Sequence, residues 1–203
     1  MKVENKEMYH FHNNKIYNDL WVVNNEIIVD DNFESAYLNV LKYFHNSVPT
    51  KDGGTESFDI IIDNYLSQEQ NKETLIDMLK EASHIIFGMK IFMRELALEE
   101  IRRQNYPNLP SRKHSIWLCD SNGIEFWKDQ LSNHGQIPID LYKVLVTGNL
   151  FQSSDEFLPN SFSNFETQLK EADNYWKAEN IKEEYKMEYL FQGKLKILEK
   201  VNN

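Results

Sequence analysis

The sequence predicts an α+β fold in which strands lie toward both ends of the chain and helices lie between them. Short apolar or alternating segments, typical of strands, occur at residues 7–12 and 26–29 and again after Pro110. Between them, residues 67–106 carry apolar side chains three and four positions apart, which is helical spacing. This grouping favours an α+β fold with a helical insertion over a doubly wound parallel sheet.

Length and composition favour one domain of 203 residues, with residues 32–110 as the helical insertion. The apolar fraction of 41%, with 12 Phe, 10 Tyr and 4 Trp, is enough for a sizeable core and argues against disorder. No apolar run is long enough to span a bilayer, and the first ten residues lack the apolar region of a secretory signal. We therefore expect no membrane partner. Cys119 is the single cysteine and cannot form an internal disulfide, so we also expect a cytoplasmic protein.

The formal net charge of −10 repels the phosphates of DNA and RNA. Two local basic stretches, residues 101–115 and 186–200, are the places where this repulsion could be overcome. Basic clusters are more often solvated faces, so nucleic acid is the less favoured partner.

The predicted elements follow from local patterns. Residues 33–44 have helical spacing, and residues 67–105 predict two helices separated at Gly88 and stopped by the prolines that follow. After Pro110 we expect a strand, a helix, a second strand and a third helix, at residues 114–120, 121–133, 139–151 and 163–178. Residues 183–201 predict a hairpin with its turn near Gln192–Gly193.

His10 and His12 alternate with Tyr9 and Phe11 in the first strand, so the two imidazoles share one face. No spacing in the sequence supplies a third metal ligand, and we expect no metal site. The histidines are either ordinary hydrogen-bonded side chains or, for His10, a donor to a ligand.

Arginines are the next candidates. Arg94 and Arg102 lie on the predicted helix with acidic neighbours, which indicates either ion pairs on a wet face or contact with phosphate. Ser111 and Arg112 follow a proline and lead into a strand, a position from which an arginine can reach phosphate or carboxylate. Trp117, within that strand, is either core or a platform for a ligand.

Two carboxylates complete the set. Asp155 lies in the loop that follows the strand ending near Gly148, and Glu188 alternates with apolar residues in a late strand. Glu188 either faces a cleft, where it would stabilise a developing cation, or lies at a sheet edge in water. The sequence contains no nucleophile elbow, phosphate-binding glycine loop, dinucleotide fingerprint or paired-cysteine zinc site.

The order of these motifs resembles the ADP-ribosyltransferase fold, and in particular the small rifampin ADP-ribosyltransferases. The residues that carry this resemblance are "YHFH", "SIWLCDSNGIEFWKDQL", "LYKVLVTGNLFQSSDEFLPN" and "MEYLFQGKLKI". The chain also resembles an uncharacterised bacterial family, DUF2441, through "RELALEEIRR" and "YPNLPSR".

The resemblance implies a split mixed or antiparallel sheet of the ADP-ribosyltransferase type, whose cleft binds NAD, with His10 on a ribose and Trp117 near nicotinamide. The acid would be Glu188, which we favour, or Asp155. Arginines would neutralise the pyrophosphate, and the cofactor-binding residues outside the sheet would be Ser111, Arg112, Arg94 and Arg102.

The implied activity is transfer of ADP-ribose from NAD to an unknown acceptor, a protein or small molecule, or hydrolysis of NAD. A fixed carboxylate beside an oxocarbenium-like ribose stabilises the transition state more than the ground state. A bacterial toxin, defence or modification enzyme would fit this activity. The alternative is a non-catalytic nucleotide-binding or protein-interaction module on the same fold.

Overall fold

The computed structural model forms two compact units, residues 1–36 with 94–203, and residues 37–93. It describes residues 1–13, 20–35, 47–49, 55–57, 60, 62–63, 72–133 and 139–201. The helix expected at residues 33–44 lies mostly outside these described residues. The first unit contains every residue that the sequence proposes for the site.

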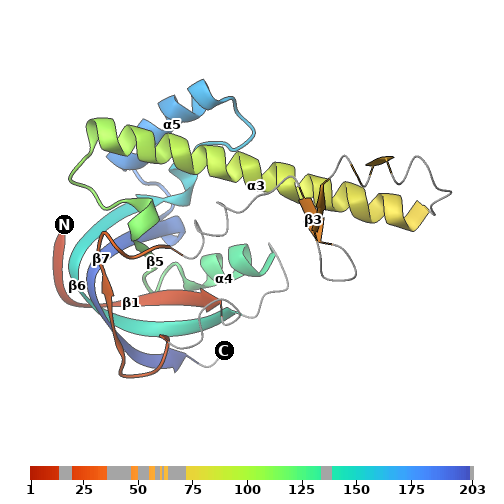
Figure 1. Cartoon of the computed structure of the whole chain (residues 1–203). Coiled ribbons are helices and arrows are strands. Elements are labelled where there is room, and N and C mark those ends of the chain that lie inside the picture. Colours follow the sequence, from red (N-terminus) through yellow and green to blue (C-terminus); the bar gives the residue numbers. More distant parts are fainter. Residues whose placement is uncertain are drawn as a thin grey trace. The chain divides into compact units, whose positions relative to one another are not determined.

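The first unit is built on a five-stranded antiparallel sheet, which confirms the α+β class. Its hydrogen-bonded order is β1–β6–β7–β2, and β5 also pairs with β7. The strands are β1 (Lys2–Asn13), β2 (Glu26–Val29), β5 (Ile116–Leu118), β6 (Ile139–Ser154) and β7 (Met187–Val201). Two 2.9 Å backbone hydrogen bonds between Tyr9 and Cys119 connect the end of β5 to β1. The path β1–β6–β7–β5 therefore returns to its first strand (Figure 1).

The long strands β6 and β7 run side by side and curve together (Figure 1). Gly148 and Gly193 face each other across this pair with φ of 155° and 144°. A Cβ on Gly148 would lie 2.3 Å from the carbonyl oxygen of Gln192, so a side chain does not fit. The hairpin expected near Gln192–Gly193 is therefore wrong. Gly193 allows close approach to β6, and β7 continues because β6 supplies a partner along its whole length.

Helix α3 (Lys72–Asn105) is continuous through Gly88, so the expected division into two helices is also wrong. A single glycine inside a helix costs about 1 kcal/mol, which good helix formers on both sides offset. The predicted stop before the prolines is confirmed, since the helix ends at Asn105. No helix among the described residues is long and apolar enough to cross a membrane.

Two further helices confirm their predicted positions, α4 (Ile124–Asn133) and α5 (Phe165–Lys177). Asn164 caps α5 by accepting a hydrogen bond from the Thr167 N–H. Short 3-10 turns precede β5, follow β6 and precede β7, at Arg112–His114, Asp155–Phe157 and Glu184–Lys186. In the second unit, β3 (Ser47–Pro49) pairs with β4 (Thr55–Ser57).

The two faces of the main sheet bury different cores. The first core contains Met8, Ile27, Val29, Ile116, Leu118, Tyr142, Val144, Val146, Leu150, Tyr189, Phe191, Leu195 and Ile197. The second core contains Leu98, Phe151, Ala172, Tyr175, Trp176 and Leu190. The indole N–H of Trp176 donates to the Leu98 carbonyl at 2.7 Å, which joins α5 to α3 above this second face. Strand alternation therefore decides which core each side chain of β7 meets.

Candidate functional site

A buried network of charges lies against the second core, with Arg112 at its centre. Its guanidinium donates to both carboxylate oxygens of Glu95, with Nε–Oε2 at 2.7 Å and Nη2–Oε1 at 3.2 Å. Nη1 of Arg112 lies 2.6 Å from Oε1 of Glu188 and also donates to the Tyr175 hydroxyl. That hydroxyl in turn donates to Glu188. The four residues are at most 5% exposed, so α3, α5, β7 and the turn before β5 meet at one arginine.

Burial and charge oppose each other at these groups. Burial alone would raise the pKa of Glu95, but the charges of Arg112 and Arg94 outweigh it and lower that pKa. Burial would lower the pKa of Arg112, but Glu95, Tyr175 and Glu188 raise it well above its usual value. Burial raises the pKa of Tyr175 well above its usual value, and Glu188 adds to that rise against Arg112. Arg112 and Glu95 therefore remain ionised beside a neutral Tyr175 phenol.

Asp155 lies at the edge of this network, in the 3-10 turn directly after β6. It is half-buried, and burial raises the pKa of its carboxyl, with the negative charge of Glu188 as the next cause. Arg94, Lys186 and Arg112 oppose this rise. Within the described part of the chain, the Asp155 carboxylate accepts no hydrogen bond, so Asp155 is the accessible acid of the site.

Among the described residues, Arg94 makes one hydrogen bond, from Nη2 to Oε1 of Glu95 at 3.1 Å. Its Nε is buried and has no hydrogen-bond partner among the described residues. The side chain is only 14% exposed. An arginine this buried usually satisfies more of its five N–H groups, because leaving a donor unpaired costs free energy.

Arg102 and Ser111 meet at Glu99, one helical turn beyond Glu95 on α3. Arg102 donates to both oxygens of Glu99 and to the carbonyls of Pro107 and Leu109. The Ser111 hydroxyl donates to Oε2 of Glu99 at 3.1 Å and accepts from the Lys113 N–H. Both residues therefore hold the chain that leads from α3 into the Arg112 turn.

Trp117 lies on the same face of the sheet as Glu188, because it is paired with Leu190 in the register of β5 and β7. The guanidinium carbon of Arg112 lies 5.3 Å from the centre of its ring and 4.9 Å from that of Tyr175. The cation is thus placed between two aromatic faces. Trp117 is partly buried against the second core.

His10 lies on the other face of the sheet. It is paired with Tyr142, a residue of the first core, in the register of β1 and β6. Its Nδ1 lies 2.9 Å from the Trp117 carbonyl oxygen, and since a carbonyl only accepts, Nδ1 carries the hydrogen. The Trp21 ring stacks on His10 at 4.2 Å and on His12 at 4.9 Å. Burial lowers the pKa of His10 to about 4, with the Trp117 hydrogen bond opposing and His12 assisting.

The structure brings five of the proposed site residues together. Arg112 contacts Glu188 and Trp117, Arg94 shares Glu95 with Arg112, and the charge of Glu188 acts on Asp155. Ser111 and Arg102 contact Glu99 instead, one turn farther along α3. His10 does not meet Glu188, because the two side chains project from opposite faces of the sheet.

Sequence reasoning missed the part that Glu95 and Tyr175 take in the network, and the stacking of Trp21 on His10 on the other face of the sheet. Glu95 stood next to Arg94 in a run that predicts surface ion pairs, and nothing local indicates that it is buried. The apolar spacing of "ADNYWKA" at residues 172–178 was the available signal for Tyr175.

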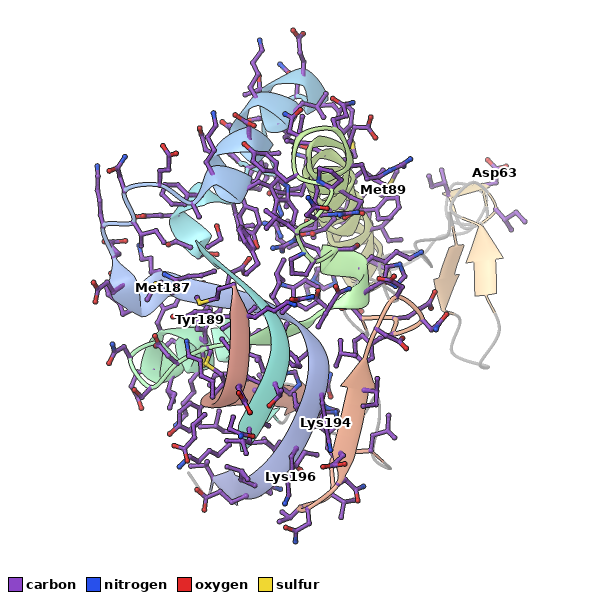
Figure 2. The ribbon with its side chains drawn as sticks, turned by 90° about the vertical axis from the view of Figure 1, so that its left-hand side faces the viewer. Asp63, Met89, Met187, Tyr189, Lys194 and Lys196 are labelled. Atoms are coloured by element: carbon purple, nitrogen blue, oxygen red, sulfur yellow. The ribbon has the colours of Figure 1, made fainter. Side chains whose placement is uncertain are left out.

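Two shallow hollows lie away from this network. One, of about 240 Å³, is lined by Glu4, Asn5, Glu26, Leu145, Thr147, Lys194 and Lys196. Lys194 and Lys196 project from the part of β7 beyond Gly193, far along the strand from Met187 and Tyr189 (Figure 2). The other, of about 190 Å³, is lined by Phe157, Asn174, Lys177, Glu179 and Asn180. No group of residues that could hold a metal ion is found among the described residues.

Fold and site define an α+β protein with a five-stranded antiparallel sheet and a buried arginine–carboxylate network on one of its faces. The model of a protein family described as a protein of unknown function, DUF2441, matches residues 8–203. The chain belongs to this family, and the match includes every residue of the network. A comparison with curated proteins found no match.

Proposed function

We propose that this protein cleaves the bond between nicotinamide and ribose in NAD and passes ADP-ribose to an acceptor, or to water. The observation that carries the proposal is the buried network of Glu188, Arg112, Glu95 and Arg94, with the acid Asp155 in the turn directly after β6. These side chains come from four separate segments of the chain. The resemblance in motif order supplies the substrate class.

The chemistry assigned to the site follows from charge. As the glycosidic C–N bond breaks, its electron pair leaves with nicotinamide, whose ring nitrogen becomes neutral, and positive charge grows on the ribose. A fixed carboxylate stabilises that charge in the transition state more than in the ground state. The attacking oxygen or nitrogen forms its bond to the ribose carbon and gives a proton to the carboxylate.

Of the two acids, Asp155 is better placed to receive the proton. Glu188 is 5% exposed and already accepts hydrogen bonds from Arg112 and Tyr175. Asp155 is half-buried, accepts no hydrogen bond within the described part of the chain, and has a raised pKa. A carboxyl with a raised pKa takes up a proton more readily, which suits a general base. In the proposed mechanism, the buried Glu188 contributes a fixed negative charge that stabilises the positive charge on the ribose, and it takes up no proton.

The test is release of nicotinamide from NAD by the purified protein, followed by chromatography. Wild type should release nicotinamide, and Asp155→Asn should reduce the rate at least about a hundredfold, the usual contribution of a positioned acid or base. Glu156→Gln, in the same turn, serves as the matched control and should keep the wild-type rate. Absence of both nicotinamide release and NAD binding would remove the proposal.

A second candidate, a non-catalytic interaction module, is favoured by the surface of α3. Leu79, Ile86 and Met93 are spaced seven residues apart and are 40–61% exposed, and Phe87 and Met89 are exposed beside them. Exposed apolar side chains in a heptad row are typical of a helix that packs against another helix. Sedimentation of the wild type should then show concentration-dependent association that Ile86→Lys abolishes, and NAD should not bind.

A further inference from the structure

Helix α3 has one buried side and, roughly opposite to it, one exposed apolar side. The buried side is formed by Gly88, Ile91, Glu95 and Leu98, which follow one another three or four positions apart. The exposed side carries a row of large apolar residues, Leu79, Ile86, Met89 and Met93, with Ile76 and Phe87 beside it. A surface helix of a globular protein normally presents polar residues on this side.

The apolar row follows the heptad spacing of helices that pair with each other. Leu79, Ile86 and Met93 lie seven positions apart, at position a, and Ala82 and Met89 lie three positions after the first two, at position d. Every a and d residue from Leu79 to Met93 is therefore apolar. Two identical rows of this kind fit each other about a two-fold axis, so a second copy of the chain presents the matching surface.

The charged side chains of this stretch lie away from the row. Asp77 pairs with Lys80 at 3.4 Å, and Glu81 lies 3.9 Å from His84. In the heptad these four residues occupy the outer positions b, c and f. Two copies that meet along the row therefore bury apolar side chains without bringing these charges into the contact.

The exposed apolar area is of the size that a dimer needs. The six residues of the row and its flank are 40% to 61% exposed. A half-exposed side chain of this size leaves roughly 100 Å² open to solvent, so the six leave roughly 600 Å². A stable interface covers about 800 Å² on each partner, its polar rim included. The row thus supplies most of one side of such an interface.

We propose that two copies of this chain pair through the apolar row of α3, with the two helices antiparallel. The antiparallel arrangement places the opposite ends of the two helix dipoles side by side. It also keeps the larger units apart, because each continues from residue 94 at the C-terminal end of the row, and a parallel pair would bring both to the same end. The inference rests on the second candidate function and names its partner, and it is compatible with NAD cleavage at the sheet.

Sedimentation velocity of the full chain over a range of concentrations measures the pairing. The wild type should shift from monomer to dimer as its concentration rises, and Ile86→Lys, which places a charge in the row, should raise the dissociation constant at least about tenfold. His84→Lys is the matched control, because the His84 side chain is 78% exposed and projects about 200° around the helix from Ile86. It should associate like the wild type, and circular dichroism checks that both variants are folded. A wild type that stays monomeric at every concentration would overturn the inference, although NAD cleavage would then still stand.

Disulfide trapping tests the orientation. The variants Leu79→Cys and Met93→Cys are oxidised with diamide, each alone and as an equimolar mixture, and the wild type with its buried Cys119 gives the background. Leu79 and Met93 lie about 21 Å apart along the helix, so in an antiparallel pair the two 79 positions are out of disulfide reach, whereas position 79 lies near position 93 of the second copy. We therefore expect linked dimers in the mixture only. Linked dimers of each variant alone would show a parallel pair and overturn the inference, while the second candidate function would stand.

Discussion

Nη1 of Arg112 lies 2.6 Å from Oε1 of Glu188, and both side chains are almost completely buried. The carboxylate of the late strand is thus one half of a buried ion pair that connects β7 to the turn before β5. Removing one partner of such a pair leaves the other charge without full compensation. Glu188 therefore contributes to stability whatever its part in the chemistry.

Substitution of Glu188 by Gln should lower the free energy of unfolding by about 2 to 4 kcal/mol, because Arg112 loses a charged partner in a buried site. Urea denaturation at neutral pH measures this loss. Glu166→Gln is the matched control, since Glu166 pairs with Lys170 at a site where its side chain is 83% exposed. That control should change stability by less than about 0.5 kcal/mol. An equally small change in both variants would contradict a buried pair.

His10 should make the protein less stable in mild acid. Its pKa is lowered from 6.5 to about 4 in the folded protein, so between these values the unfolded chain binds a proton that the folded chain does not. The free energy of unfolding therefore rises with pH across this window, by at most about 3 kcal/mol. His10→Gln keeps a donor for the Trp117 carbonyl and should flatten the dependence between pH 5 and 7. An unchanged slope in urea titrations would show that His10 is not the group responsible.

Cys119 should resist thiol reagents in the folded protein. It is 3% exposed, and burial together with the nearby Asp120 raises the pKa of its thiol to about 12, so little thiolate forms at pH 8. Labelling with an aromatic disulfide at pH 8 should be slow in buffer and fast in denaturant. Rapid labelling of the native protein would mean that the backbone pairing of Tyr9 with Cys119 opens readily.

Leu98 should be among the most sensitive positions of α3. It is fully buried in the second core, and its carbonyl accepts the hydrogen bond of Trp176. Leu98→Ala should cost about 2 to 5 kcal/mol through the cavity that it leaves. Leu79→Ala makes the same change on the same helix where the side chain is 61% exposed, and it should cost far less. Similar losses, measured by thermal unfolding, would place Leu98 outside the core.

Local patterns were sufficient for elements whose ends carry clear signals. The prolines after Asn105 end α3, and Asn164 caps α5, both as short-range chemistry requires. The helix break predicted at Gly88 and the turn predicted at Gly193 were both wrong, because a glycine alone does not show whether the chain turns. Pairing with β6 continues through Gly193, so β7 does not turn there, and the paired residue, Gly148, lies more than forty positions away in the sequence.

In the candidate site, too, local signals predicted only part of the arrangement. Residue chemistry singled out Arg112 and Glu188 as candidates, and the structure pairs the two side chains. Alternation along one strand shows which residues share a face, but it does not show which core that face meets. The sequence therefore could not predict that His10 and Glu188 lie on opposite faces of the sheet. The burial of Glu95 was not expected, because a helix sequence rich in charges predicts ion pairs on a solvent-exposed face, whereas here that face covers the second core.

The measurement that tests the account most directly is a crystal structure of the protein with ADP-ribose. With ADP-ribose bound, we expect the nicotinamide-side ribose beside Asp155 and Glu188 still paired to Arg112. Density for the dinucleotide at another surface, such as the hollow lined by Lys194 and Lys196, would contradict both the site and the role given to Asp155.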